Sequence, residues 1–299
     1  MAYNIQSLPL YVEQRRLPLI AEAVLKAKSA SLFNLQTDIK RSAAINLVST
    51  DPVFQTGGCG WNAQGDVTFT QRIINTGLIK INMAFCEKDL LKTWMGYEVK
   101  AGLSDEALPF EEYFMNNIIE KVQAGVEKGI WQGNTASGDE TINKTDGLIK
   151  ILNEADGVIK PTIATGTSAY DAIKAVYMAI PEKVLNKAVI LCGADVFRSF
   201  MQEIVEKNYY HYSADGYPVE EFILPGTNTK VIALNGLNGT NTIVAADLNN
   251  LFYGVDMAND TEIFDVWYSK DFREHRIAIE FNFGVQVAFP NEVVMGTIA

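Results

Sequence analysis

The residues that most often carry enzyme chemistry are scarce in this sequence. Its 299 residues include only two histidines, His211 and His275, which lie far apart. The chain contains neither the HExxH and GxSxG motifs of hydrolases nor the phosphate-binding GxxxxGK(S/T) loop. We therefore expect no catalytic residue, no cofactor-binding residue and no enzyme activity.

Cysteine is equally scarce. Cys59, Cys86 and Cys192 are far apart and form no CxxC pair, so neither a disulfide framework nor a metal site is indicated. Free thiols are the simple expectation in a reducing cytoplasm. The N-terminus lacks the basic-then-apolar pattern of a secretory signal, and no run approaches the roughly 18 apolar residues of a membrane helix. We expect a cytoplasmic protein without a membrane partner.

Positive charge is scarce as well. The chain carries 25 Lys and Arg against 36 Asp and Glu, a net charge of -11. This balance argues against a protein that binds nucleic acid by neutralising phosphates. Residues 1–44 are the exception, with six basic and three acidic residues. A solvated helix face is the simpler interpretation of this segment, and contact of an N-terminal arm with an acidic partner is the alternative.

Hydrophobic residues, by contrast, make up 48% of the chain, enough for a buried core, and the length suggests about two lobes. We expect residues 1–44 to form an arm with one short helix, Ala21–Lys28, and too few apolar residues to bury on its own subunit. Residues 45–86 alternate apolar and polar side chains, as strands with one buried face do. Glycine-rich chain at Thr56–Asn62 separates two of these strands. The pattern predicts an extended β-hairpin with Trp61 exposed at its tip.

Two long elements follow. Apolar residues recur every four positions, which predicts a helix over Pro109–Gln132, about 36 Å long at 1.5 Å per residue. Near the C-terminus, apolar residues alternate without a break over Ile277–Phe289, which predicts a strand of roughly 43 Å. Strand Glu262–Tyr268 is expected to pair with it across a charged loop. Elements of this length indicate an elongated part of the molecule beside any compact lobe.

Between them, residues 151–257 predict a mixed α/β lobe, with a helix over Ile173–Ile180 and a buried strand at Ala188–Cys192. Residues Thr165–Ser168 precede that helix and could hold an anion at its N-terminus. Capping of the helix by Thr167 or Ser168 is the simpler interpretation. Interface and core-edge roles stay open for a cluster of four tyrosines: Tyr209, Tyr210, Tyr212 and Tyr217.

Four short motifs lie in an informative order. Thr145–Ile149 follows the long helix, Val244–Leu248 and Tyr253–Asp256 follow the strands of the lobe, and Phe264–Ser269 precedes the last long strand. Together with the order of the predicted elements, these motifs resemble the major capsid protein of tailed bacteriophages. Encapsulin shells and the capsid floor of herpesviruses share that fold. The resemblance extends from about residue 107 to the C-terminus and is weak before residue 45.

The resemblance implies an α+β fold with four parts. These are an N-terminal arm (1–44), an extended β-loop (45–86), a peripheral domain with a long spine helix and long strands (87–150 and 258–290), and an α/β apical domain (151–257 and 291–299). It implies a subunit that assembles in the bacterial cytoplasm into the hexamers and pentamers of an icosahedral virion shell around the phage genome. An encapsulin-like compartment is the nearest alternative. A cytosolic α/β enzyme that uses the Thr165–Ser168 loop is an alternative of another class.

The same resemblance places the contacts between subunits. It implies that the hairpin lies over a neighbouring subunit, while the turn before the last strand meets an adjoining capsomer. Some family members join subunits covalently through a lysine of the extended loop, but no lysine lies between Lys40 and Lys80, so we expect a non-covalent shell. Expected partners are a separate scaffold protein, a portal, a decoration protein, and genomic DNA enclosed without sequence-specific binding. The expected contact residues are Trp61, Phe69 and Arg72 in the hairpin, Lys270, Asp271, Arg273, Glu274 and Arg276 in the turn, and Arg15 and Arg16 in the arm.

Overall fold

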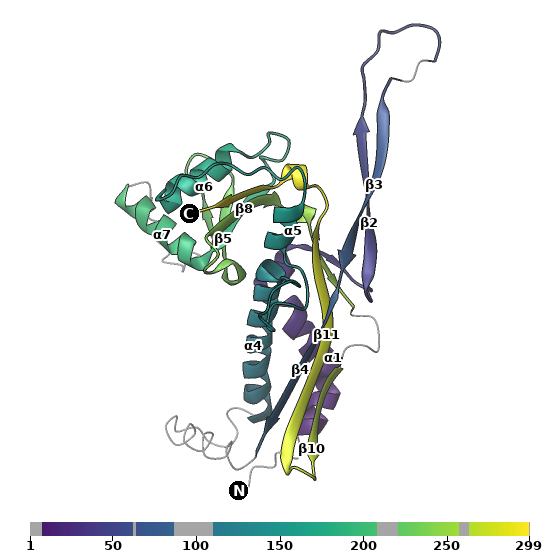
Figure 1. Ribbon diagram of the computed structural model, residues 1–299, viewed down its shortest axis with the longest axis vertical. Coiled ribbons are helices and arrows are strands. Elements are labelled where there is room, and N and C mark those ends of the chain that lie inside the picture. The colour runs from purple at the N-terminus through teal and green to yellow at the C-terminus, as the bar shows by residue number, and fades with distance from the viewer. Residues whose placement is uncertain (1–7, 62–63, 87–109, 208–220, 257–262, 299) are drawn as a thin grey trace.

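A long sheet with a long helix beside it forms the axis of the molecule (Figure 1). The computed structural model describes residues 8–61, 64–86, 110–207, 221–256 and 263–298. The central strand of the sheet is β11 (Glu274–Val287). It pairs antiparallel with β10 (Ile263–Ser269), β4 (Gly77–Phe85) and β9 (Leu251–Val255), and β1 (Asn34–Gln36) adds to β9 in parallel.

The predicted long helix and long strand are both confirmed. Helix α4 (Phe110–Gln132) has 23 residues, about 35 Å, and begins one residue after its predicted start. Strand β11 has 14 residues, three of them ahead of the predicted first residue Ile277. The predicted pairing with the preceding strand is also present, since β10 and β11 form one antiparallel ladder.

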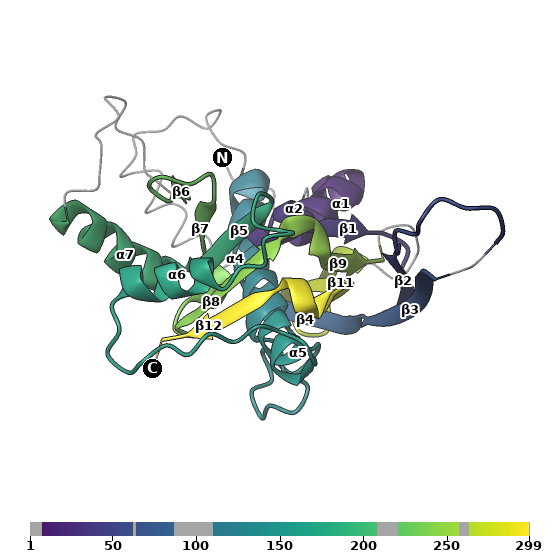
Figure 2. The same ribbon diagram turned by 90° about the horizontal axis from the view of Figure 1, so that it is seen from above.

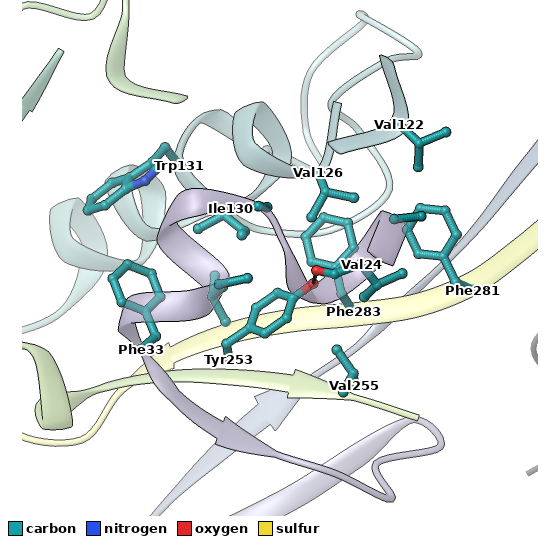
Figure 3. Packing of buried hydrophobic residues seen from close by; sticks show 14 of the residues in the cluster. Val24, Phe33, Val122, Val126, Ile130, Trp131, Tyr253, Val255, Phe281 and Phe283 are labelled. Atoms are coloured by element: carbon teal, nitrogen blue, oxygen red, sulfur yellow. Dashed lines mark hydrogen bonds between the residues drawn. The ribbon is translucent and has the colours of Figure 1, made fainter. Parts of the chain in front are cut away.

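The core between α4 and the long sheet explains why apolar residues recur so regularly in the sequences of both elements. Apolar side chains at helical spacing on α4, such as Val122 and Val126, pack with Phe281 and Phe283 of β11 (Figure 3). Gly129 allows the closest approach, because a Cβ there would lie 2.7 Å from the Phe283 Cζ atom. The ring therefore packs directly on the helix backbone.

The N-terminal segment packs on its own chain, so the expectation of a loose arm was wrong. Helix α1 (Leu8–Leu25) contacts α4 and β10, and helix α2 (Lys28–Leu32) contacts α4. The Tyr253 hydroxyl, buried below α1, donates to the Val24 carbonyl at 3.1 Å. The sequence signal was weak because Pro18 interrupts the helix pattern. The apolar surface that buries this segment is supplied by residues far along the chain.

The hairpin is shorter than predicted. Strands β2 (Ser42–Asp51) and β3 (Asp66–Asn75) form a two-stranded ribbon, and it ends at Asn75. Strand β4, which the sequence placed in the same hairpin, instead pairs with β11 in the long sheet. The chain changes its partner strand between Asn75 and Gly77, and a Cβ at Gly77 would lie 2.1 Å from the Lys144 carbonyl oxygen. Only glycine fits so close to another backbone.

The remaining chain forms a second, five-stranded sheet, which we call the compact lobe together with its two helices (Figure 2). Helices α6 and α7 pack on this sheet over a core that includes Ile173, Phe200 and Ile243. Strand β9, predicted as part of this lobe, pairs in the long sheet instead. The lobe's strands, in spatial order, are β12 (Val294–Thr297), β8 (Thr242–Asp247), β5 (Ala188–Gly193), β7 (Lys230–Leu234) and β6 (Glu221–Ile223). The helices of the lobe are α6 (Ala169–Met178) and α7 (Ala194–Glu206). Helix α5 (Leu148–Glu154) follows α4. Three short 3-10 turns complete the chain: η2 (Asn235–Leu237), η3 (Leu248–Asn250) and η4 (Pro290–Glu292).

Candidate assembly surfaces

The β2–β3 hairpin projects from the body (Figure 1) and carries an uncovered apolar face. Successive side chains of a strand point to opposite faces, and directly paired residues share one face. Val48 pairs with Phe69, and Val67 and Ile73 lie on the same face of β3. All four side chains are exposed, Phe69 with 77% of its surface. No other described part of the chain covers this face.

The opposite face of the hairpin is buried where it meets the body. Ile45, Leu47 and Ile74 lie in a small apolar cluster at this base. The Gln286 side chain of β11 donates to the Ile73 carbonyl at 2.7 Å. These contacts fix the base of the ribbon, while its outer half stands free in solvent.

The tip of the hairpin exposes two aromatic side chains. Trp61, predicted to be exposed, has 95% of its surface accessible, and Phe54 has 101%. Phe54 was missed by the sequence reasoning because it lies in irregular chain, where no period marks it. Two fully exposed aromatic residues are costly in a subunit that remains alone. Such side chains are typical of the centre of a protein interface.

The third hairpin candidate, Arg72, lies at the base and is half-buried. It lines a hollow of about 380 Å³ together with Lys144, Asp146, Glu154 and Gln286. The Asp146 carboxylate is bound by Lys150 at 2.7 Å. Hydrogen bonds from Lys150 and Thr135 hold the Asp146 pKa below its usual value, against the effect of burial. The hollow is thus polar, and a subunit contact at Arg72 stays a prediction.

The β10–β11 turn lies at the opposite end of the molecule from the hairpin (Figure 1). Within it, the Arg276 Nε atom donates to Glu274 Oε1 at 2.9 Å, and the guanidinium lies 4.6 Å from the Phe272 ring centroid. Phe272 is 68% exposed and was missed by the sequence reasoning. Three predicted contact residues are exposed around it: Lys270, Asp271 and Arg273.

The two N-terminal arginines lie on α1. Arg15 is exposed, and its Nη1 atom donates to the Tyr11 hydroxyl at 2.9 Å. The side chain of Arg16 lies outside the described residues. The predicted candidates therefore fall into three separate groups, on the hairpin, the turn and α1, and the structure does not bring them together in one subunit.

The loop before α6 holds no free anion site. Ser168 caps the helix by accepting from the Asp171 N–H, which confirms the capping interpretation. The Glu203 carboxylate accepts from the N–H groups of Ala169 at 2.9 Å and Tyr170 at 3.3 Å. The amides that would bind a substrate anion are therefore occupied by the chain's own carboxylate.

Two further reactive side chains among the described residues, Cys192 and His275, are buried. Burial raises the pKa of the Cys192 thiol to about 12, which leaves it a poor nucleophile. His275 is buried between the rings of Phe85 and Tyr268, with centroid distances of 5.3 and 5.1 Å. His211 and the four clustered tyrosines lie outside the described residues. In the described ranges no group of acidic, histidine and cysteine side chains is placed to hold a metal, and no helix there is long and apolar enough to cross a membrane.

Comparison of this architecture with solved structures decides the fold. The chain is similar to one from Gordonia phage Cozz, with a TM-score of 0.58, 14% identity and coverage of 91% of this chain and 86% of that one. It is also similar to a chain of the satellite phage P4 procapsid, with a TM-score of 0.59, 12% identity and coverage of 95% and 98%. The chain has the capsid fold of tailed phages. No family model and no curated protein matches the sequence itself.

A third solved structure has a similar fold. The virus-like particle from Pyrococcus furiosus matches with a TM-score of 0.52, 10% identity and coverage of 94% of this chain and 97% of that one. The long sheet, the long helix, the projecting hairpin and the compact lobe therefore follow the capsid fold over nearly the whole chain. At these identities the similarity shows the fold, and side-chain roles rest on the chain's own geometry.

Proposed function

We propose that this chain is a major capsid protein, a structural subunit that self-assembles into the hexamers and pentamers of an icosahedral shell around a phage genome. The observation that carries the proposal is the exposed apolar surface of the hairpin. The hairpin holds an exposed apolar face and two exposed tip aromatics away from the body. A subunit that remained alone would gain nothing from such a surface.

The proposed role of the hairpin is contact with a neighbouring subunit. Burial of a large apolar side chain contributes roughly 1.5–3 kcal/mol, so each copy of the contact is modest. A closed shell repeats the contact many times, which makes the whole stable while single contacts can still exchange during assembly. The polar β10–β11 turn, at the other end of the molecule, is proposed to meet an adjoining capsomer.

The parts of the chain take the names of the capsid fold in this proposal. The long sheet with α4 is the peripheral domain, the compact lobe is the apical domain, and the β2–β3 ribbon is the extended loop. Assembly in the bacterial cytoplasm with a separate scaffold protein, a portal and a decoration protein completes the proposal. The DNA is enclosed without sequence-specific binding, in keeping with a chain whose net charge is -11.

An encapsulin-like compartment is the second candidate, and the likeness to the Pyrococcus furiosus virus-like particle supports it. The two functions differ in their contents. Nuclease-protected DNA inside purified particles supports the phage capsid, whereas a co-purified enclosed protein with no nucleic acid supports the compartment.

The direct test is to express the chain and examine it by electron microscopy and sedimentation. We expect closed shells or capsomers from the natural sequence. Trp61→Ala should leave the far-ultraviolet circular dichroism unchanged, since the side chain is 95% exposed, but should lower particle yield severalfold. Trp61→Phe keeps an aromatic ring and should retain most of the yield. A natural chain that stays monomeric with its expected partners present, or a Trp61→Ala variant with full yield, would contradict the proposal.

A further inference from the structure

One buried carboxylate connects parts of the chain that lie far apart in sequence. Glu127 is on the buried side of α4, with 5% of its surface exposed. Its Oε2 atom accepts from the Ser29 N–H at 2.9 Å, and its Oε1 atom accepts from the Ser29 hydroxyl at 2.5 Å. Gly236, in turn η2 of the compact lobe, packs against the backbone of this same turn of α4. Glu127 thus binds the N-terminal segment through its carboxylate and lies against the lobe through its backbone.

Further hydrogen bonds and close packing connect α4 with the N-terminal segment and with the lobe around this carboxylate. Trp131, fully buried one turn further along α4, donates from Nε1 to the Ser29 hydroxyl oxygen at 2.7 Å. On the lobe side, Gln132 donates to the Gly236 carbonyl at 2.7 Å. A Cβ at Gly236 would lie 2.3 Å from the Glu127 carbonyl oxygen and 2.5 Å from Trp131 Cδ1. No larger residue fits, so η2 packs directly on this turn of the helix.

A buried carboxylate is stable only while donors surround it. Burial raises the Glu127 pKa, while the hydrogen bonds from Ser29 and the nearby charge of Lys28 lower it. If α2 left α4, the two Ser29 donors would leave with it. The carboxylate would then lose both donors while still buried, and would have to bind a proton, admit water or shift the turn of α4 on which η2 packs.

We propose that Glu127 couples the docking of the N-terminal segment, α1 and α2, to the seating of the compact lobe on α4. The Ser29 hydrogen bonds hold Glu127 and Trp131 in the arrangement on which η2 packs, so docking of either part favours the other, and such coupling is reciprocal. A force or partner that displaced the N-terminal segment would therefore loosen the lobe on the spine of the same subunit. The coupling lies within one chain and does not depend on the proposed shell.

The test is hydrogen exchange of the full-length chain, with all variants compared in one assembly state. Ser29→Ala removes one donor to Glu127 and the acceptor of Trp131. It should speed exchange of the amides in Asn235–Asn238 about tenfold, although Ser29 and this turn lie more than 200 residues apart in sequence. Ser31→Ala is the matched control, because Ser31 is in the same short helix but is exposed and bonds only locally, to the Lys28 carbonyl at 2.8 Å.

The reciprocal and double variants separate coupling from general loosening. Gln132→Ala, which weakens the lobe side, should speed exchange at the Ser29 amide. In a Glu127→Gln background, Ser29→Ala should no longer change exchange at Asn235–Asn238, because the charge that transmits the effect is absent. Should Ser29→Ala fail to fold, Trp131→Phe keeps an aromatic ring and removes the five-membered part of the indole with the N–H that orients the Ser29 hydroxyl. Faster exchange confined to α2, with Asn235–Asn238 unchanged in either variant, would overturn the coupling.

Discussion

At the scale of single residues, burial separates Glu127 from Glu120 of the same helix. Glu120, two turns earlier on α4, is exposed to solvent, whereas Glu127 is enclosed by Ser29, Trp131 and Gly236. The carboxylate keeps its place through donors supplied by Ser29 of α2. Its pKa is nevertheless raised, with burial as the largest cause. A raised carboxylate pKa means that the folded chain binds the proton more tightly than the unfolded chain does.

This shift predicts how stability depends on pH. As the pH rises from the ordinary carboxylate value of 4.5 through the raised value, natural chain should lose stability relative to a Glu127→Gln variant, which has no proton to release. Urea unfolding of the unassembled subunit at several pH values measures this difference. Glu120→Gln, at an exposed position two turns earlier on the same helix, is the matched control. A stability difference between natural and Glu127→Gln chains that stays constant across this range would contradict the prediction.

The residues that sequence reasoning missed share a physical cause. Phe54 lies in irregular chain, where no period separates a buried from an exposed aromatic side chain. Glu127 occupies a helical position that looks solvated until the partner segments are known. In both cases the exposure of the side chain depends on residues distant in sequence, which enclose Glu127 and leave Phe54 uncovered. Trp61 was recognised because the glycines around it predict a turn, and turns lie at the surface.

At the scale of elements, the hairpin shows that alternation alone identifies a strand but not its partner. Apolar and polar residues alternate in the sequences of both β3 and β4, so one long hairpin was predicted, whereas β4 pairs with β11. The long helix and β11 were predicted well, because each repeats one period over many residues. Helix α1 was predicted poorly, because its apolar surface is interrupted by Pro18 and its cover comes from α4 and β10.

The two faces of the hairpin give a matched pair of variants. Phe69→Ser alters the uncovered apolar face, and Thr70→Ser alters the neighbouring exposed position on the opposite face. Phe69→Ser should change the melting temperature of the isolated subunit little, since substitutions of exposed residues shift stability by about 0.5 kcal/mol or less. It should weaken subunit association about tenfold or more, because roughly 1.5–3 kcal/mol of apolar burial is lost per contact.

Sedimentation equilibrium or light scattering of the two variants measures this difference. Thr70→Ser should associate like the natural chain. Equal loss of association in both variants would point to a general disturbance of the ribbon. Unchanged association in Phe69→Ser would remove the apolar face from the proposed interface.

At the scale of the whole molecule, the chemistry of the subunit contacts determines the conditions under which a shell dissociates. The hairpin offers apolar side chains and, from Ser42 to Asn75, no lysine that could form a covalent link to a neighbour. Apolar contacts are not weakened by salt screening, which acts on exposed charges, but denaturant weakens them. Particles should therefore persist at high salt and dissociate to single chains in boiling detergent with reductant. The reductant matters because Cys59 is exposed at the tip. A ladder of subunit multiples on the denaturing gel would show that a covalent bond forms by chemistry other than a hairpin lysine.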